Sequence, residues 1–514
     1  MAAGIFLSRL TGLVRERALA HYFGSSLAAD AFRAAFRIPN LLQNLFGEGA
    51  LSASFIPVYA RLLARGERDE ARRVAGAVAA LLALIVSVLV LAGVLGTPLI
   101  IDLIAPGFSG ARRVLTIELV RIFFPGAGIL VMSAWCLGVL NSHGRFLLSY
   151  TAPVVWNAAI IGTLVMFGGR QDAARLALTV AWGSVIGSAL QFAVQLPSVM
   201  RLAGRMRFRP ALASSAVRTV ARNFGPVFVS RGVVQLSAYV DQFIASWLPA
   251  GSVALIGYAQ NLAVLPVSLF GASVSAAELP AMAGVVGHAD EIAAALRLRL
   301  DDGLRRIAFF IVPSAVAFLV LGDVIAGAIY RTGRFTHADT LWVWAILAGS
   351  AVGLLASTLG RLYSSAYYAL HDTRTPLRFA VVRVVLTIGL GYLSALPLPH
   401  WLGIDHRWGM AGLTASAGIA GWVEFMLLRG ALTPRIGRTG VPASLVARLW
   451  AVAALAAAVA WAVGRMTSPT HAIVRASLAL PVYGLVYIGA AMVLRVPEAA
   501  ALLARLQRRL RRTP

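Results

Sequence analysis

One stretch constrains this chain more than any other, residues 27 to 63, LAADAFRAAFRIPNLLQNLFGEGALSASFIPVYARLL. It is long and apolar enough to cross a bilayer, yet at about 100° per residue Asp30, Arg37 and Glu48 share one line, with Arg33 beside it. An ionised group in hydrocarbon costs roughly 3 kcal/mol or more, so such a stripe must face a bundle interior or a watery cavity. We therefore expect a single helix whose polar face lines a chamber inside a membrane protein.

The composition supports a membrane location. Hydrophobic residues make up 59% of the 514 residues and charged residues only 13%, with a mean hydropathy of +0.79. The net charge of +25 comes from arginine alone, because the chain has no lysine, and in a membrane protein it points to anionic lipid and topology rather than to nucleic acid. The single Cys136 excludes a disulfide framework and a cysteine metal site, and we expect no metal.

Apolar runs of about 20 residues predict an all-α polytopic membrane protein with about 14 transmembrane helices. Residues 2 to 23 carry charges that interrupt any signal-peptide core, so we expect this segment to be retained. An even number of spans places both termini on one side, and most arginines fall there, which predicts cytoplasmic termini. The predicted centres are near residues 12, 45, 90, 130, 158, 188, 232, 268, 316, 352, 387, 419, 455 and 484.

The sequence contains a weak internal repeat. LFGEGALSASFIPVYA at 45 to 60 is similar to LFGASVSAAELPAMA at 269 to 283, an offset of about 224 residues. Chance similarity between two apolar helices is the alternative, and the letters alone leave both open. The repeat favours two pseudo-symmetric six-helix lobes plus two C-terminal helices, as in many transporters. The predicted divisions are 1–200, 201–430, 431–496 for the last two helices, and a basic cytoplasmic tail at 497–514.

Several strings resemble the MurJ (MviN) family of lipid II flippases, in the MOP superfamily of flippases and exporters. They are SRLTGLVRE at 8–16, FGSSLAADAF at 23–32, IPNLLQNLFGEGALSASFIPVYA at 38–60, APGF at 105–108 and YALHDTRTP at 368–376. The resemblance runs nearly end to end. It implies two lobes around a cationic central cavity, a lipid-tail groove formed with the last two helices, and transport by alternating access in the bacterial inner membrane. It also implies a monomer that is not an enzyme and that supports cell wall biogenesis and cell shape.

The cargo implied by the resemblance is lipid II, an undecaprenyl-diphosphate-linked peptidoglycan precursor. Guanidinium groups suit a diphosphate because they offer paired donors and stay charged. The family's first-span arginines correspond to Arg9 and Arg15, whereas Gln43 and Asn261 stand at two positions where the family has arginine. Arg33 and Arg231, the latter in the predicted seventh span, are candidate replacements for the lost charge, and the alternative is that both extend to the membrane interface. The expected substrate-binding set is Arg9, Arg15, Asp30, Arg33, Arg37, Glu48, Arg231 and Asn261.

Some family members bind sodium, and Asp241 matches an acidic ligand of that site. Thr387 replaces an expected polar ligand, and Arg383 lies one turn before it, so either Arg383 pairs with Asp241 in place of the ion or Asp241 lies near the outer interface. Coupling to sodium or to the membrane potential is the expectation, with no other cofactor. The first span begins about two turns later than in the family, which suggests a truncated or misplaced start at Met1.

Three other functions compete with a lipid II flippase. A membrane enzyme is disfavoured, because no acidic cluster with metal-ligand spacing occurs in the loops. A non-transporting scaffold for envelope synthesis, which would bind cell-wall machinery, is disfavoured because idle buried charges cost stability. A flippase for another polyprenyl-diphosphate-linked glycan stays open, since two family arginines are missing.

Overall fold

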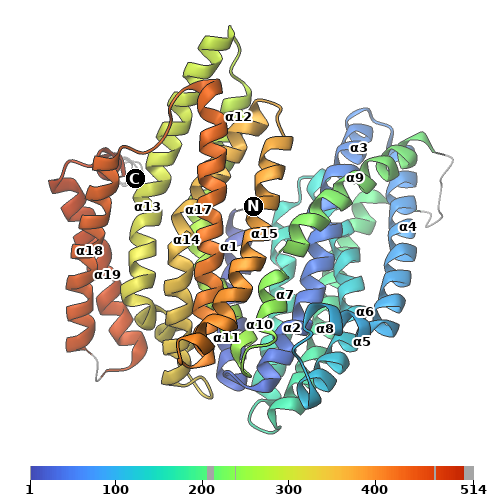
Figure 1. Cartoon of the computed structure of the whole chain (residues 1–514). Helices are drawn as coiled ribbons and strands as arrows, with labels where there is room; N and C mark the ends of the chain where they lie inside the picture. Colours follow the sequence, from blue (N-terminus) through green and yellow to red (C-terminus); the bar gives the residue numbers. More distant parts are fainter. Residues whose placement is uncertain (1, 205, 207–213, 238, 468–469, 503–514) are drawn as a thin grey trace, which may run out of the picture. The chain divides into compact units, whose positions relative to one another are not determined.

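The computed structural model describes every residue except 1, 205, 207–213, 238, 468–469 and 503–514 (Figure 1). The side chains of Glu48 and Arg231 also lie outside the description, although their backbones are helical. The described chain is built from helices, which satisfy their backbone N–H and C=O groups within each segment, as a bilayer requires. It forms two compact units, Met1–Ala254 with Thr332–Phe335, and Leu255–Arg331 with Thr336–Pro514, called unit 1 and unit 2 below.

Unit 1 contains the helices up to residue 245. Phe46 packs against Phe224 and Phe228, with ring centroids 5.8 and 5.1 Å apart, which joins the segment after residue 200 to the N-terminal helices. The predicted lobe boundary lies at 200, whereas this unit continues to Ala254. Its elements are α1 (Ala2–Phe23), α2 (Leu27–Leu42), the π-helix η1 (Gln43–Leu51), α3 (Ser52–Ala64), α4 (Arg68–Leu95), α5 (Thr97–Ile104), α6 (Gly110–Ser142), α7 (Phe146–Phe167), α8 (Ala173–Ala203), α9 (Ser215–Ser237) and α10 (Val240–Ala245).

Unit 2 holds the remaining helices, apart from the first residues of α11. Its core lies between α13, α14 and α17, where Tyr363 and Tyr367 are buried and Tyr367 donates to the carbonyl of Leu428 at 2.9 Å. The elements are α11 (Ser252–Pro266), the π-helix η2 (Val267–Ala272), α12 (Ser273–Ala283), α13 (Ala289–Tyr330), α14 (His337–Ala369), α15 (Arg374–Ala395), α16 (Pro397–Trp401), the 3-10 helix η3 (His406–Trp408), α17 (Gly409–Ile436), α18 (Ala443–Met466) and α19 (Ala472–Val493).

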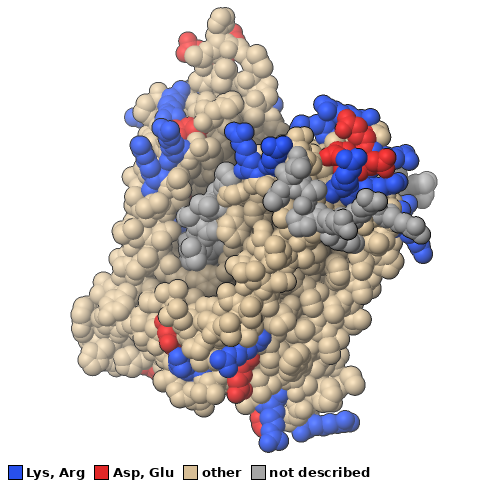
Figure 2. Space-filling model, turned by 90° about the vertical axis from the view of Figure 1, so that its right-hand side faces the viewer, with Lys and Arg blue, Asp and Glu red and all other residues tan. Residues whose placement is uncertain are grey.

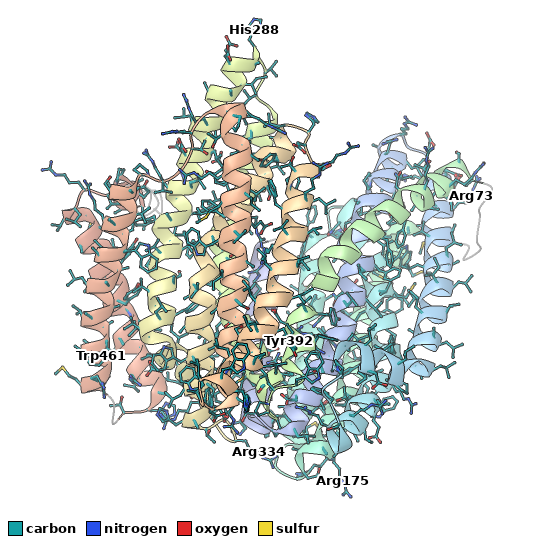
Figure 3. The ribbon with its side chains drawn as sticks, in the orientation of Figure 1. Arg73, Arg175, His288, Arg334, Tyr392 and Trp461 are labelled. Atoms are coloured by element: carbon teal, nitrogen blue, oxygen red, sulfur yellow. The ribbon has the colours of Figure 1, made fainter. Side chains whose placement is uncertain are left out.

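Every predicted span centre falls on or beside a helix. Within the described residues, 11 helical segments are long and apolar enough to cross a membrane. The other predicted spans correspond to α1, to α2 with η1 and α3, and to α9, each of which carries arginines. On the face drawn in Figure 2, the charged side chains lie in an upper and a lower group, and the described residues between these groups are mostly uncharged. Within unit 1, Arg73 lies at one end and Arg175 and Arg334 at the other (Figure 3).

The internal repeat has a structural counterpart. The two π-helices begin at Gln43 and Val267, 224 residues apart, and both contain the repeated Leu-Phe-Gly. Each is preceded by an α-helix and followed by another that carries an internal proline, Pro57 or Pro280. A π-helix of this length is rare in proteins. The shared position therefore supports a repeat rather than a chance similarity of apolar letters.

The π-helix also corrects the predicted polar stripe. The stripe assumed one α-helix from 27 to 63, but regular α-helical geometry ends at Leu42 and resumes at Ser52. Because a π-turn holds more residues than an α-turn, the angle per residue falls, and residues beyond 42 leave the predicted line. Glu48 therefore cannot be placed on the face of Asp30 by counting turns.

The last two helices are attached to α13 at a proline. Pro313 has no N–H, so the carbonyl of Phe309 one turn earlier loses its helical partner. The hydroxyl of Tyr487 on α19 donates to that carbonyl at 2.7 Å, and Tyr483 donates to the carbonyl of Pro313 at 2.6 Å. Both tyrosines are buried. The proline thus leaves the Phe309 carbonyl free to accept from Tyr487, and the two tyrosine hydrogen bonds hold α19 against α13.

Candidate functional site

A buried charged cluster links α1 to α2 in unit 1. Glu16 is 5% exposed and forms ion pairs with Arg15, at 2.7 Å, and with Arg33. Three ionised groups in so little water are tolerable only when they neutralise one another and are hydrogen-bonded. The cluster keeps one net positive charge. Arg33, which sequence analysis placed on the polar face of its helix, therefore has a carboxylate partner on the preceding helix.

Arg15 is held from three directions. Besides Glu16, it donates to the side-chain oxygen of Asn157 on α7 at 2.9 Å. Its guanidinium carbon lies 5.0 Å from the ring centre of Phe36 and 5.5 Å from that of Trp156, and these two rings stack on each other at 5.4 Å. Aromatic faces attract guanidinium groups. The arrangement fixes the position of Arg15, and one of its nitrogens, Nε, has no hydrogen-bond partner among the described residues.

Asp30 is held by partners from three other parts of unit 1. It is fully buried, and its carboxylate accepts from the backbone N–H groups of Gly251 at 2.7 Å and Ala254 at 2.8 Å. Arg112 on α6 donates to it at 3.3 Å. The two N–H groups belong to the start of α11, where unpaired donors favour a carboxylate. Asp30 therefore binds the end of a helix and Arg33 pairs with Glu16, and the shared chamber stays a prediction.

Arg9 lies on a cavity of about 340 Å³ in unit 1. Gln43, at one of the positions where the family has arginine, lines the same cavity. Arg9 is exposed and Gln43 half-buried, so the cavity is open at this end. The structure brings together these two sequence-predicted positions, and it places Arg15 in the separate cluster described above.

The other predicted site residues are distributed over both units. In unit 1, Asp241 attracts the guanidinium of Arg37 electrostatically. In unit 2, Arg383 pairs with Glu424 at 3.1 Å, and its predicted pairing with Asp241 stays a prediction. Thr387 on α15 and Asn261 on α11 are half-buried. The predictions for the side chains of Glu48 and Arg231 lie outside the described residues.

Sequence reasoning missed several polar residues of unit 1. It overlooked Glu16 because the carboxylate lies next to Arg15 in the chain and was counted only as an interruption of a hydrophobic run. It also passed over the uncharged side chains that meet at the Arg9 cavity. Two of them, Gln191 and Gln195, could have been found from the sequence, because two amide side chains one turn apart are unusual in an apolar helix. In the described residues, no group of three or more His, Cys, Asp or Glu could hold a metal ion.

Comparison with known proteins matches most of the chain to one protein family. A family model described as lipid II flippase MurJ matches residues 19–481. The lipid II flippase MurJ of Burkholderia cenocepacia is 32% identical over 429 residues, which cover 82% of this chain and 80% of that protein. A probable lipid II flippase MurJ of Rhizobium meliloti is 31% identical over 468 residues, covering 88% and 84%.

Solved structures agree with the sequence relatives. A structure of lipid II flippase MurJ in an inward closed conformation has a TM-score of 0.77 at 25% identity and covers 96% of this chain and 98% of that one. An inward-facing multidrug resistance MATE transporter of the MOP superfamily has a TM-score of 0.63 at 16% identity, covering 83% and 95%. The second likeness shows the fold alone.

Proposed function

Because this chain belongs to the lipid II flippase MurJ family, we propose that it flips lipid II across the bacterial cytoplasmic membrane by alternating access. The observation that carries the proposal is the family match over residues 19–481. Arg9, which the resemblance equates with a family arginine, supports the proposal because it lies on an open cavity. Membership in a family of flippases makes the chain a multi-pass bacterial membrane transporter and not an enzyme. Its task would be to supply the peptidoglycan precursor for cell wall synthesis.

The charges of unit 1 suit a diphosphate cargo. Arg9 is exposed on the cavity, and the Arg15 cluster adds one net positive charge held at a fixed position. Charge-assisted contacts from guanidinium to a phosphate oxygen are short and strong. Buried cationic side chains raise the free energy of the protein when no cargo is bound. Binding of an anionic cargo lowers that free energy because the anion neutralises them. Arg37, half-buried on α2, belongs to the same proposal.

Complementation tests the proposal directly. The chain would be expressed in a strain depleted of its own lipid II flippase, and growth and outer-leaflet lipid II would be measured by cleavage with an external enzyme. We expect rescue by the natural chain and loss with Arg9→Ala. Arg175→Ala, at an exposed side chain in the first turn of α8, is the matched control. No rescue by a chain that reaches the membrane at normal levels would refute lipid II transport.

A different polyprenyl-diphosphate-linked glycan is the second candidate, and Gln43 and Asn261 at family arginine positions favour it. If Arg231 replaces the missing charge, Arg231→Ala should weaken transport roughly ten- to a hundredfold, as expected for one lost contact to a buried anion. Adding Asn261→Arg should then restore part of it. Loss without such rescue would leave Arg231 important but would refute the replacement.

Energy coupling and partners complete the proposal. Coupling to sodium through Asp241, or to the membrane potential, would be separated by measuring flipping in vesicles with each gradient imposed alone. We also propose that the chain acts as a monomer beside the cell-wall synthesis machinery. Mass measurement of the purified protein in detergent would test the first statement, and cross-linking in cells the second.

A further inference from the structure

The buried end of the Arg9 cavity is polar but uncharged. The cavity extends from exposed Arg9 to side chains on α6, α7 and α8 that are almost fully buried. No carboxylate belongs to its described lining. Its polar lining includes Arg9, Gln43, Ser133, Ser149, Gln191 and Gln195, together with Ser8 and Tyr150. All of them belong to unit 1.

Three of these side chains have hydrogen-bonding atoms that the protein leaves unused. Gln191 and Gln195, one turn apart on α8, both donate to the hydroxyl of Ser133 at 2.9 Å. Their side-chain oxygens, and the hydroxyl oxygen of Ser149, have no hydrogen-bond partner in the described structure. The three residues are only 3%, 1% and 1% exposed. Buried polar atoms are nearly always paired, because each unpaired one costs about 1–3 kcal/mol. Three such groups on residues that line one cavity give it unused hydrogen-bonding capacity for a polar molecule.

The size and chemistry of the cavity restrict what that molecule can be. About 340 Å³ lies at the lower end of the range for small-molecule sites and far exceeds the space for one water. Amide and hydroxyl groups recognise neutral groups that both donate and accept hydrogen bonds. Rotating either glutamine amide by half a turn would exchange its oxygen and nitrogen, which leaves a donor unpaired in place of an acceptor. The single guanidinium at the open end adds a place for an anion. The lining therefore fits a neutral ligand with hydroxyl and amide groups that is joined to an anionic group.

We propose that this cavity binds the acetamido sugar of the transported lipid while the diphosphate lies at Arg9. The inference rests on the proposed function, since the anion at Arg9 would be the diphosphate of the cargo. Gln191, Gln195 and Ser149 are then residues that determine specificity for the sugar. They distinguish a sugar-bearing lipid from the bare polyprenyl diphosphate, which uses only the cationic end.

Binding measurements on the purified full chain test the proposal. The probes are undecaprenyl diphosphate, the same lipid carrying one N-acetylated amino sugar, and that lipid with a peptide on the sugar. Gln191→Leu with Gln195→Leu removes the unpaired oxygens at similar volume. It should weaken binding of the two sugar-bearing lipids roughly tenfold, as expected for one or two neutral hydrogen bonds, and leave undecaprenyl diphosphate unchanged. Arg9→Ala should weaken binding of all three.

A second variant keeps the test decisive if the leucine pair fails to fold. Ala134→Leu fills the cavity from α6 without removing a hydrogen bond and should show the same selectivity. Ser188→Ala is the control, because Ser188 is buried on α8, outside the described lining. Equal losses for all probes, no loss at all, or a loss confined to the peptide-bearing lipid would overturn the sugar subsite. Failure of the natural chain to bind any probe would instead refute the proposed function.

Discussion

Glu16 on α1 pairs with Arg33 on α2 while it also pairs with its neighbour Arg15. One carboxylate is therefore the partner of two arginines whose side chains are each 15% exposed. Removing one partner of a buried ion pair leaves an uncompensated charge, which costs more than the pair contributes. The stability of unit 1 should depend on Glu16 more than on either arginine.

Glu16→Gln should lower the free energy of unfolding by roughly 3 kcal/mol, because two close guanidinium groups lose the carboxylate that they share. The measurement is the melting temperature of the purified protein in detergent. Asp102→Asn is the matched control, since it breaks the more exposed Arg113 pair and should change the melting temperature far less. Equal shifts in the two variants would show that the cluster is not buried as described.

Asp30→Ala should destabilise the protein more than Asp30→Asn does. Alanine leaves the N–H groups of Gly251 and Ala254 without their acceptor and removes the carboxylate partner of Arg112, whereas asparagine keeps one acceptor. Melting temperatures and flipping rates of both variants would be compared. A stable Asp30→Asn protein with no transport would return Asp30 to the substrate site.

Tyr487→Phe should loosen α19 from α13, because the carbonyl of Phe309, next to Pro313, then loses the hydroxyl that donates to it. The expected loss is about 1–3 kcal/mol, the cost of an unpaired buried polar group. Hydrogen exchange of α19 would detect it. Tyr392→Phe, at an exposed residue of α15, should leave exchange unchanged.

The loop between α14 and α15 should be sensitive to acid. Asp372 accepts from the backbone N–H and hydroxyl of Thr375 and from Arg435, which lowers the pKa of its carboxyl to about 2. Since the unfolded pKa is about 3.9, the stabilisation is complete above that value and is lost as the pH falls towards 2. Asp372→Asn should remove this part of the pH dependence of melting, and the exposed Asp290→Asn should not.

Membrane topology is testable with single cysteines in a Cys136→Ser background. The arginine distribution predicts that 61–73, 201–222 and 429–448 are cytoplasmic and that 249–252 and 397–408 face outward. In intact cells an impermeant thiol reagent should label Leu402→Cys but not Arg65→Cys, two exposed positions. The reverse pattern would contradict cytoplasmic termini.

Sequence patterns predicted the helices well because a bilayer demands long apolar helical segments, and each expected span centre falls on or beside one. They could not predict partners such as Arg15 with Asn157, which are 142 residues apart and meet only through packing. The π-helix at Gln43 was also invisible, since hydrophobic periodicity was read at the α-helical angle. Neutral residues such as Gln195 escaped because the search followed charge.

The two π-helices also carry information about ancestry. A π-helical segment adds residues to an α-helix, and here the addition begins at Gln43 in one half and at Val267 in the other, at the same place in the repeated motif. Two independent insertions at one position are a less economical history than a single one. The simplest order of events is an insertion in an ancestral half-length protein, followed by gene duplication and fusion, so the irregular turn is older than the two-lobed transporter that now contains it.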